Sequence, residues 1–168
     1  VAHLLDATAE RAGGLDVMFV NAGESLDWQP VELGDPAMWR RNIETNLFGA
    51  YHCARLAIPH LRRRGGGKII MMGSGQGHRG SPGVSSYACS KAALWMLVQV
   101  MAEELKDAGI AVNEIQPGGV RTTLGRHAPA GRVGTAGLRE PEEVVPLAVF
   151  LASQPANGPT GQTFSLRR

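Results

Sequence analysis

The stretch that most restricts the possible folds of this chain runs from Lys68 to Lys91. Its first five residues, KIIMM, are a short apolar run that predicts a buried strand. A glycine-rich loop that carries Ser74 follows, and a helix is predicted to begin at Ser85. Tyr87 and Lys91 are four residues apart, so a helix holds both side chains on one face. The order of strand, loop and helix predicts that a hydroxyl, a phenol and an ammonium group meet at one rim of the fold.

These three groups suit acid–base chemistry on a carbonyl compound. A free phenol has a pKa of about 10, and a cation within about 4–6 Å can lower such a pKa by roughly 1–3 units. Lys91 is placed to lower the pKa of Tyr87, whose phenol can then give a proton to a carbonyl oxygen or take one from an alcohol. Ser74 can donate a second hydrogen bond to that oxygen. The tyrosine and lysine alone are more typical of a helix surface, and the serine after the strand favours the catalytic interpretation.

Length and charge narrow the classes of function. At 168 residues and 17.8 kDa, the chain is predicted to form one domain. Its net charge of +2 argues against a nucleic-acid or membrane partner. Cys53 and Cys89 lack metal-like spacing, so no metal site is predicted and both are interpreted as free thiols in a reducing compartment. Without a long apolar run or a signal peptide, a cytoplasmic protein is expected.

The spacing of apolar residues predicts the other elements of the fold. Helices are expected at residues 1–12, 36–64, 85–106 and from Glu140, and strands at 15–20, 68–72, 110–115 and 163–166. Asp35 is the expected N-cap of the 36–64 helix, with Pro36 at its first position. Asn46 falls on the apolar stripe of that helix, where a buried amide needs hydrogen-bond partners. It is interpreted either as a core residue at a helix kink or as part of the site.

Four motifs resemble those of the short-chain dehydrogenase/reductase family. They are Ser74, the pair Tyr87 and Lys91, the Asn-Ala-Gly sequence at 21–23, and the Pro-Gly sequence at 117–118. The match covers nearly the whole chain, in the family's order and spacing. Members are oxidoreductases that use NAD or NADP on a Rossmann-type sheet, and the most similar group includes 3-oxoacyl carrier-protein reductases and many alcohol dehydrogenases. The resemblance implies an α/β fold, a Rossmann-like parallel sheet with flanking helices.

The resemblance also implies a role for each catalytic residue. Tyr87 would be the acid/base, and Ser74 the donor that polarises the substrate oxygen. Lys91 would shift the pKa of the phenol and bind the ribose of the cofactor. Asn46 would kink its helix and order a water molecule next to the lysine. The implied reaction is hydride transfer between nicotinamide and a small carbonyl or alcohol substrate.

The resemblance places the cofactor contacts in three parts of the chain and at the catalytic helix. The 21–23 sequence would approach the adenosine ribose, the 117–118 turn would lie under the nicotinamide, and Thr122, more than Thr123, would bond its carboxamide. The expected NAD or NADP contacts are Asn21, Ala22, Gly23, Tyr87, Lys91, Pro117, Gly118 and Thr122. Residues 123–140 occupy the family's substrate-loop position, with the polar residues Arg126, His127, Arg132 and Arg139.

The glycines at residues 75–80 fit the pattern G-x-G-x-x-G of dinucleotide-binding loops. A loop of that kind opens directly into a helix whose N-terminus meets the pyrophosphate. Here Ser81, Pro82 and Gly83 interrupt the path to the helix. The pattern is therefore not interpreted as a phosphate-binding fingerprint.

One departure from the family affects function directly. Family members begin with a strand, a T-G-x-x-x-G-x-G loop and a helix, and two more strands precede the Asn-Ala-Gly motif. Residues 1–168 contain none of these, so we expect a single, partial NAD(P)-binding domain with four of the family's seven strands. The 16–20 strand would form an unpaired edge, and the chain alone would bind either cofactor poorly. The choice between NAD and NADP belongs to the missing part.

Two functions follow from this departure. The first is an NAD(P)-dependent oxidoreductase, and the alternative is a catalytically inactive truncated fragment that acts as an interaction module. A homodimer or homotetramer is expected through the helices at 36–64 and 85–106. Trp95, Met96 and Val100 support this expectation, because they add more apolar side chains to the 85–106 helix than one core-facing stripe needs.

Overall fold

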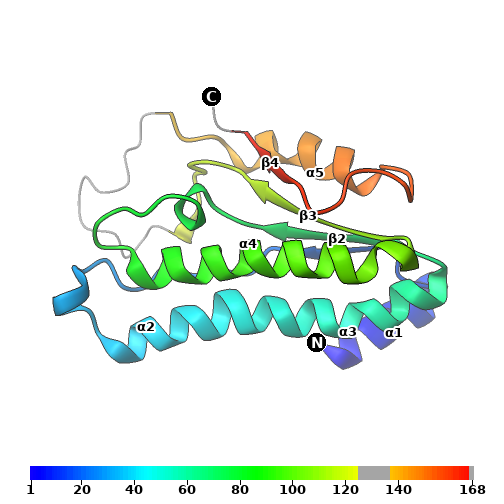
Figure 1. Ribbon diagram of the computed structural model, residues 1–168, viewed down its shortest axis with the longest axis horizontal. Coiled ribbons are helices and arrows are strands. Elements are labelled where there is room, and N and C mark those ends of the chain that lie inside the picture. Colours follow the sequence, from blue (N-terminus) through cyan, green and yellow to red (C-terminus); the bar gives the residue numbers. More distant parts are fainter. Residues whose placement is uncertain (125–136, 167–168) are drawn as a thin grey trace.

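The computed structural model describes residues 1–124 and 137–166. It has three layers, with a parallel sheet between α3 and α4 on one face and α5 on the other (Figure 1). The sheet consists of β1 (Val17–Val20), β2 (Gly67–Met72), β3 (Ile110–Gln116) and β4 (Thr163–Ser165). These four strands are parallel and lie in the order β1-β2-β3-β4. The predicted α/β fold with four parallel strands is confirmed.

The two central strands are buried because helices cover both of their faces. β2 is the run predicted from KIIMM, and Ile69, Ile70 and Met71 are almost completely buried in it. β1 lies at one edge of the sheet and pairs only with β2 in the described part of the chain. The expectation of an edge strand at this position is therefore met within these residues.

In the described part of the chain, five α-helices flank the sheet: α1 (Ala2–Ala12), α2 (Pro36–Ile43), α3 (Gly49–Arg64), α4 (Ser85–Leu105) and α5 (Val145–Ala152). Their ends follow the expected caps. The Asp35 carboxylate accepts a hydrogen bond from the Ala37 N–H at 2.8 Å, and Pro36 is the first residue of α2. Gly109 ends the segment after α4 with a left-handed φ of 66°.

The predicted helix over residues 36–64 is present as one helical run, and the kink that one interpretation placed at Asn46 is a change of helix type within it. A π-helical segment, Glu44–Phe48, separates α2 from α3 and contains Asn46. Such a segment inserts an extra residue into the helix and shifts the buried face. Tyr51, expected on the buried stripe, is consequently 43% exposed, whereas Ala57 is fully buried. Two smaller corrections concern element starts, because β1 begins at Val17 and a 3-10 turn at Pro141–Val144 precedes α5.

Two hydrophobic clusters hold the layers together. The larger one lies between the sheet and the helices α1, α3 and α4, and includes Leu5, Leu61, Leu94 and Val112. The smaller one packs α5 against the opposite face through Leu151 and its neighbours. Within the residues that the structure describes, none of the helices combines the length and apolar character that crossing a membrane requires. The loops that follow the carboxyl ends of the strands form the candidate site described next.

Candidate active site

A cavity of about 760 Å³ opens at the carboxyl ends of β1, β2 and β3. Parallel sheets bind ligands at this edge, because the loops that leave the strands converge there. All eight residues predicted to contact a cofactor line it: Asn21, Ala22, Gly23, Tyr87, Lys91, Pro117, Gly118 and Thr122. Ser74 lines it as well. The structure thus brings together three loops and one helix that are distant in sequence.

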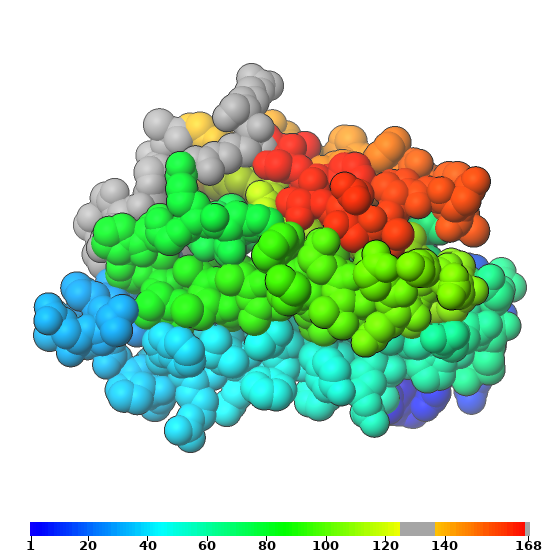
Figure 2. Space-filling view, viewed as in Figure 1, coloured from blue at the N-terminus to red at the C-terminus, as the bar shows by residue number. Residues whose placement is uncertain are grey.

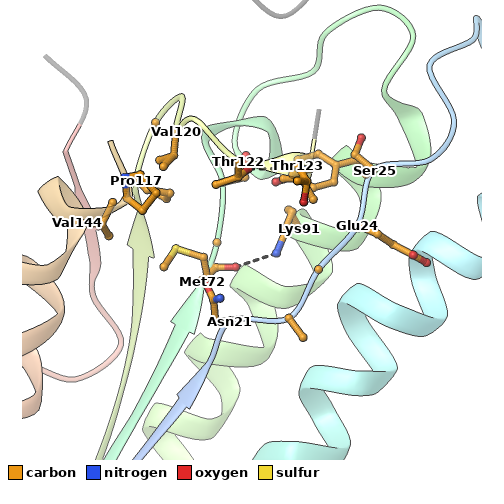
Figure 3. Close-up of a pocket in the computed structure, with 18 of the residues that line it drawn as sticks. Asn21, Glu24, Ser25, Met72, Lys91, Pro117, Val120, Thr122, Thr123 and Val144 are labelled. Carbon is orange, nitrogen blue, oxygen red and sulfur yellow. Dashed lines mark hydrogen bonds between the residues drawn. The ribbon is translucent and has the colours of Figure 1, made fainter. Parts of the chain in front are cut away.

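The loop after β2 and the start of α4 place the three predicted catalytic side chains. The Ser74 hydroxyl accepts a hydrogen bond from the Gln76 N–H at 3.2 Å, which begins a 3-10 turn. The Lys91 ammonium is buried and donates to the Met72 carbonyl at 2.8 Å (Figure 3). Its Nζ atom lies 5.8 Å from the centre of the Tyr87 ring. The predicted meeting of hydroxyl, phenol and ammonium is found in this cavity.

Burial governs the acid–base properties of this site. It raises the pKa of the Tyr87 phenol above its ordinary value, and the Ser74 hydroxyl opposes this by favouring the phenolate. Burial also lowers the pKa of Lys91 to about 8, against the attraction of the Glu114 carboxylate. The expectation that Lys91 lowers the pKa of Tyr87 is wrong for this arrangement, since the cost of burying the phenolate is larger. Tyr87 is therefore protonated near neutral pH and is ready to donate.

Asn46 is buried but does not belong to the described cavity lining. Its side-chain amide makes two hydrogen bonds to the backbone of Glu24: it accepts from the Glu24 N–H at 2.8 Å and donates to the Glu24 carbonyl at 2.8 Å. It also donates to the Ser90 hydroxyl at 3.0 Å. A Cβ added to Gly23 would lie 3.2 Å from Asn46 Oδ1 and 3.6 Å from Lys91 Nζ. Asn46 thus fixes the loop after β1 next to Lys91, from within the helix kink.

A second asparagine acts in the same way and was missed from the sequence. Asn42 is fully buried, donates to the Ser86 hydroxyl at 2.7 Å and accepts from the Leu26 N–H at 3.4 Å. Together with Asn46 and Ser90, it ties the loop to α4. The signal was present in the sequence, because two asparagines and two serines each recur at a spacing of four, which places each pair on one helix face.

Among the described residues that line the cavity, Lys91 supplies the positive charge, and much of the remaining surface is apolar. Glu24 lines it, but its carboxylate turns toward α2 (Figure 3), where Arg41 binds it at 3.1 Å and Thr45 at 2.7 Å. Lys91 is the charged group that faces inward from the described lining. The rest of that lining consists mainly of apolar side chains, among them Phe19, Leu26, Met72, Val120, Leu124 and Val144.

The predicted substrate loop lies partly outside the described residues, and this applies to Arg126, His127 and Arg132. Arg139 is described and serves the fold, since its guanidinium donates to the Pro117 carbonyl at 3.4 Å and to the Leu166 carbonyl. These bonds hold the turn at residues 117–118 to the end of β4. In residues 1–124 and 137–166, no group of metal-ligating side chains lies close enough together to hold an ion.

The glycines at 75–80 do not lead directly into a helix, in agreement with the rejection of the fingerprint. Residues 75–77 form the 3-10 turn, and α4 begins only at Ser85. A Cβ added to Gly77 would lie 2.6 Å from the Lys91 carbonyl carbon. Close packing of the turn against α4 accounts for this glycine.

Comparisons with known proteins agree with this geometry. Residues 1–132 match the family model described as short chain dehydrogenase. The chain is 36% identical to the cis-4-hydroxycyclohexanecarboxylate dehydrogenase of Sinomonas cyclohexanicum, a match over 94% of this chain and 66% of that relative. It thus spans slightly less than two thirds of the length of this curated relative.

Two solved structures have the same architecture. The oxidoreductase yciK of E. coli superposes with a TM-score of 0.89 at 27% identity, over 99% of this chain and 68% of that one. A protein of Shigella flexneri 2a, solved in complex with NADP, superposes with a TM-score of 0.87 at 26% identity, over 98% of this chain and 68% of that one.

Proposed function

Because the chain belongs to the short-chain dehydrogenase family, we propose that it carries the active site of an NAD(P)-dependent oxidoreductase. The reaction is hydride transfer between nicotinamide and a carbonyl or alcohol substrate. One observation carries this proposal: Ser74, Tyr87 and Lys91 share a single cavity with every residue that the sequence assigned to cofactor binding.

The cavity fits the nicotinamide end of a dinucleotide. Its volume of about 760 Å³ lies within the range of small-molecule and cofactor sites. Gly23 leaves open the space beside Lys91 that a side chain would fill, and Gly118 turns the backbone with a φ of 77°. Thr122 places a hydroxyl at the same wall. These features support the ribose and carboxamide contacts expected for either NAD or NADP, and the solved neighbour with NADP is in keeping with them.

The bound cofactor would supply or accept the hydride, and the side chains of this chain would handle the proton. In reduction, Tyr87 gives its proton to the carbonyl oxygen, which its protonated state at neutral pH favours. Ser74 donates a hydrogen bond to the same oxygen and so stabilises the charge that develops there. Lys91 holds the cofactor ribose and supplies a positive charge beside the phenol. Asn46 holds the loop that forms the wall next to Lys91 and, we propose, orders a water molecule there.

The apolar lining favours an uncharged carbonyl group on a largely hydrocarbon substrate. Leu26, Leu124 and Val145 provide such a surface in the described part of the cavity. The dehydrogenase relative from Sinomonas is named for a hydroxylated cyclohexane acid. A secondary alcohol and its ketone are therefore the substrate pair that we propose.

The direct test is hydride transfer from a reduced nicotinamide that carries deuterium at both C4 positions. We expect protein expressed from its complete reading frame to reduce a panel of cyclic and linear ketones, with deuterium appearing on the carbinol carbon. NADH and NADPH are compared side by side, which identifies the cofactor. If neither supports reduction or the reverse oxidation across the panel, the oxidoreductase is excluded and the non-catalytic interaction module becomes the better explanation.

We also propose that the protein forms a homodimer or homotetramer through the helices at 36–64 (α2, the π-helical segment and α3) and 85–106 (α4). These helices lie side by side on one face of the molecule (Figure 2). The large hydrophobic side chains exposed on these helices include Phe48, Tyr51, Met96 and Val100. Trp95 was predicted, together with Met96 and Val100, to exceed what the core-facing side of the helix needs. Its ring instead packs against that of His78, with the ring centres 5.1 Å apart.

Sedimentation tests this association. We expect the wild-type protein to sediment as a dimer or tetramer at tens of micromolar, and Met96→Glu to shift it toward the monomer by placing a charge in the apolar contact. A wild-type monomer at this concentration contradicts the proposal.

We further propose that the protein works in the cytoplasm. Cys53 and Cys89 are free thiols in the structure, which suits a reducing compartment. Cell fractionation tests this, and recovery of the protein in a secreted fraction contradicts it.

A further inference from the structure

Glu114 is a buried acid that the mechanism above does not use. It lies on β3 and has no exposed surface. Its Oε2 atom accepts from the Thr163 hydroxyl at 2.7 Å, faces His78 Nε2 at 3.1 Å and lies 3.5 Å from Gln116 Nε2. Its Oε1 atom has no hydrogen-bond partner among the described residues. A buried carboxylate with one unpaired oxygen costs stability, so its position calls for a functional reason.

The unpaired oxygen points at the backbone of the Ser74 turn. A Cβ added to Gly73 would lie 1.7 Å from Glu114 Oε1 and 2.3 Å from its Cδ atom. The carboxylate therefore occupies the space that any side chain at residue 73 would need. Gly73 is bonded to β3 through its N–H, which donates to the Ile115 carbonyl at 2.9 Å. Glu114 thus packs directly under the residue that precedes Ser74.

The same carboxylate acts on Lys91. Its negative charge favours the ammonium form, whereas burial of Lys91 disfavours that form. Among the described residues, the carboxylate interacts with two titratable groups: electrostatically with Lys91 of α4, and through a contact at 3.1 Å with His78, 30% exposed, of the loop after β2. β4 contributes the uncharged hydroxyl of Thr163 and β3 the amide of Gln116. Lys91 in turn donates to Met72, the residue before Gly73.

We propose that Glu114 is a positioning residue of the active site, which supports the Gly73–Ser74 turn from below and acts on the Lys91 side chain that is bonded to the adjacent Met72. This inference rests on the proposed function for its catalytic consequence, but its two physical parts concern residues of this chain alone. His78 provides a polar partner that offsets the burial of the carboxylate and connects it to the surface.

The first test measures Lys91 directly in Glu114→Gln, which keeps the size of the side chain and removes its charge. With lysine labelled at ¹³Cε, the Lys91 resonance is assigned by its loss in Lys91→Arg. We expect it to titrate near pH 8 in the wild type and at lower pH in Glu114→Gln. Glu104→Gln, which removes an exposed acid from α4, should leave the Lys91 midpoint unchanged. An unchanged midpoint in Glu114→Gln overturns this part of the proposal, whether or not the protein is active.

The pH profile of kcat/KM gives the catalytic readout. The fall of kcat/KM that accompanies loss of the Lys91 proton should move to lower pH in Glu114→Gln. Each pH unit of that movement lowers kcat/KM about tenfold at pH values above both midpoints. A purely structural role would instead lower kcat/KM equally at every pH. If Lys91 titrates as expected but the protein transfers no hydride, the proposed function fails and this inference stands.

The second part is tested by a double substitution. Gly73→Ala should lower the melting temperature by about 5 °C, since the new methyl group would overlap the Glu114 carboxylate. In the Glu114→Ala background the same change should cost little, because the space is free. An equal cost in both backgrounds shows that Glu114 does not support the turn, and overturns this part. Gly80→Ala, where nothing lies within 4 Å, is the matched control.

Discussion

Replacing Tyr87 with phenylalanine is expected to lower turnover by about 10²–10⁴-fold, the usual contribution of general acid–base catalysis. The phenol is the proton donor in the proposed reduction, and desolvation raises its pKa further above the neutral range. Phenylalanine keeps the ring that lies 5.8 Å from the Lys91 ammonium, so the cavity wall is preserved. Cofactor affinity should therefore stay close to that of the wild type, as measured by nucleotide fluorescence next to steady-state rates.

The chain offers a matched control for this substitution. Its other tyrosine, Tyr51, lies on α3 and is 43% exposed. Tyr51→Phe removes the same hydroxyl group outside the cavity and should leave kcat unchanged. If Tyr87→Phe keeps more than about a tenth of the wild-type turnover, another group carries the proton.

The second large effect is expected at Gly77, and it is structural. A methyl group there would lie 2.6 Å from the Lys91 carbonyl carbon, 2.8 Å from its oxygen and 2.9 Å from the Ala92 nitrogen. All three atoms belong to the backbone of α4, so no side-chain rotation can relieve the overlap. Gly77→Ala should push the Ser74 turn away from Lys91. We expect a loss of about 1–3 kcal/mol, which corresponds to a fall in melting temperature of roughly 2–12 °C.

Activity should fall along with stability in Gly77→Ala, because the same turn carries Ser74. Gly80→Ala separates this cause from a general intolerance of the loop, since a Cβ at that position meets open space. Calorimetry and kcat/KM are compared for both variants. Equal behaviour of the two variants would show that the close approach of the turn to α4 is not what requires glycine at residue 77.

Much of the fold, and the meeting of Ser74, Tyr87 and Lys91 in one cavity, could be predicted from sequence because they depend on local patterns. The apolar run of β2 and the spacing of Tyr87 and Lys91 on α4 are set within a few residues. Asp35 capped α2 as expected for the same reason. Parallel strands then bring their carboxyl ends to one edge, which is why Asn21 and Pro117 meet in one cavity despite their distance in sequence.

The tertiary structure decided what depends on packing between distant segments. The π-helical segment around Asn46 lets its side chain bond to Glu24 and Ser90. The sequence placed a kink at Asn46 but indicated neither the π-helical geometry nor these partners. Glu114 is a polar residue in a strand by sequence, yet it lies fully buried beneath Gly73.

The same distinction explains why the pKa of Tyr87 moved opposite to the expectation from its spacing. Sequence placed a cation four residues from the phenol, which by itself predicts a lower pKa. The loss of solvent around both groups has a larger effect: it raises the pKa of Tyr87 and lowers that of Lys91. Spacing along a helix is a local property that the sequence determines alone. Desolvation depends on every element that packs around the site, so only the folded chain could decide it.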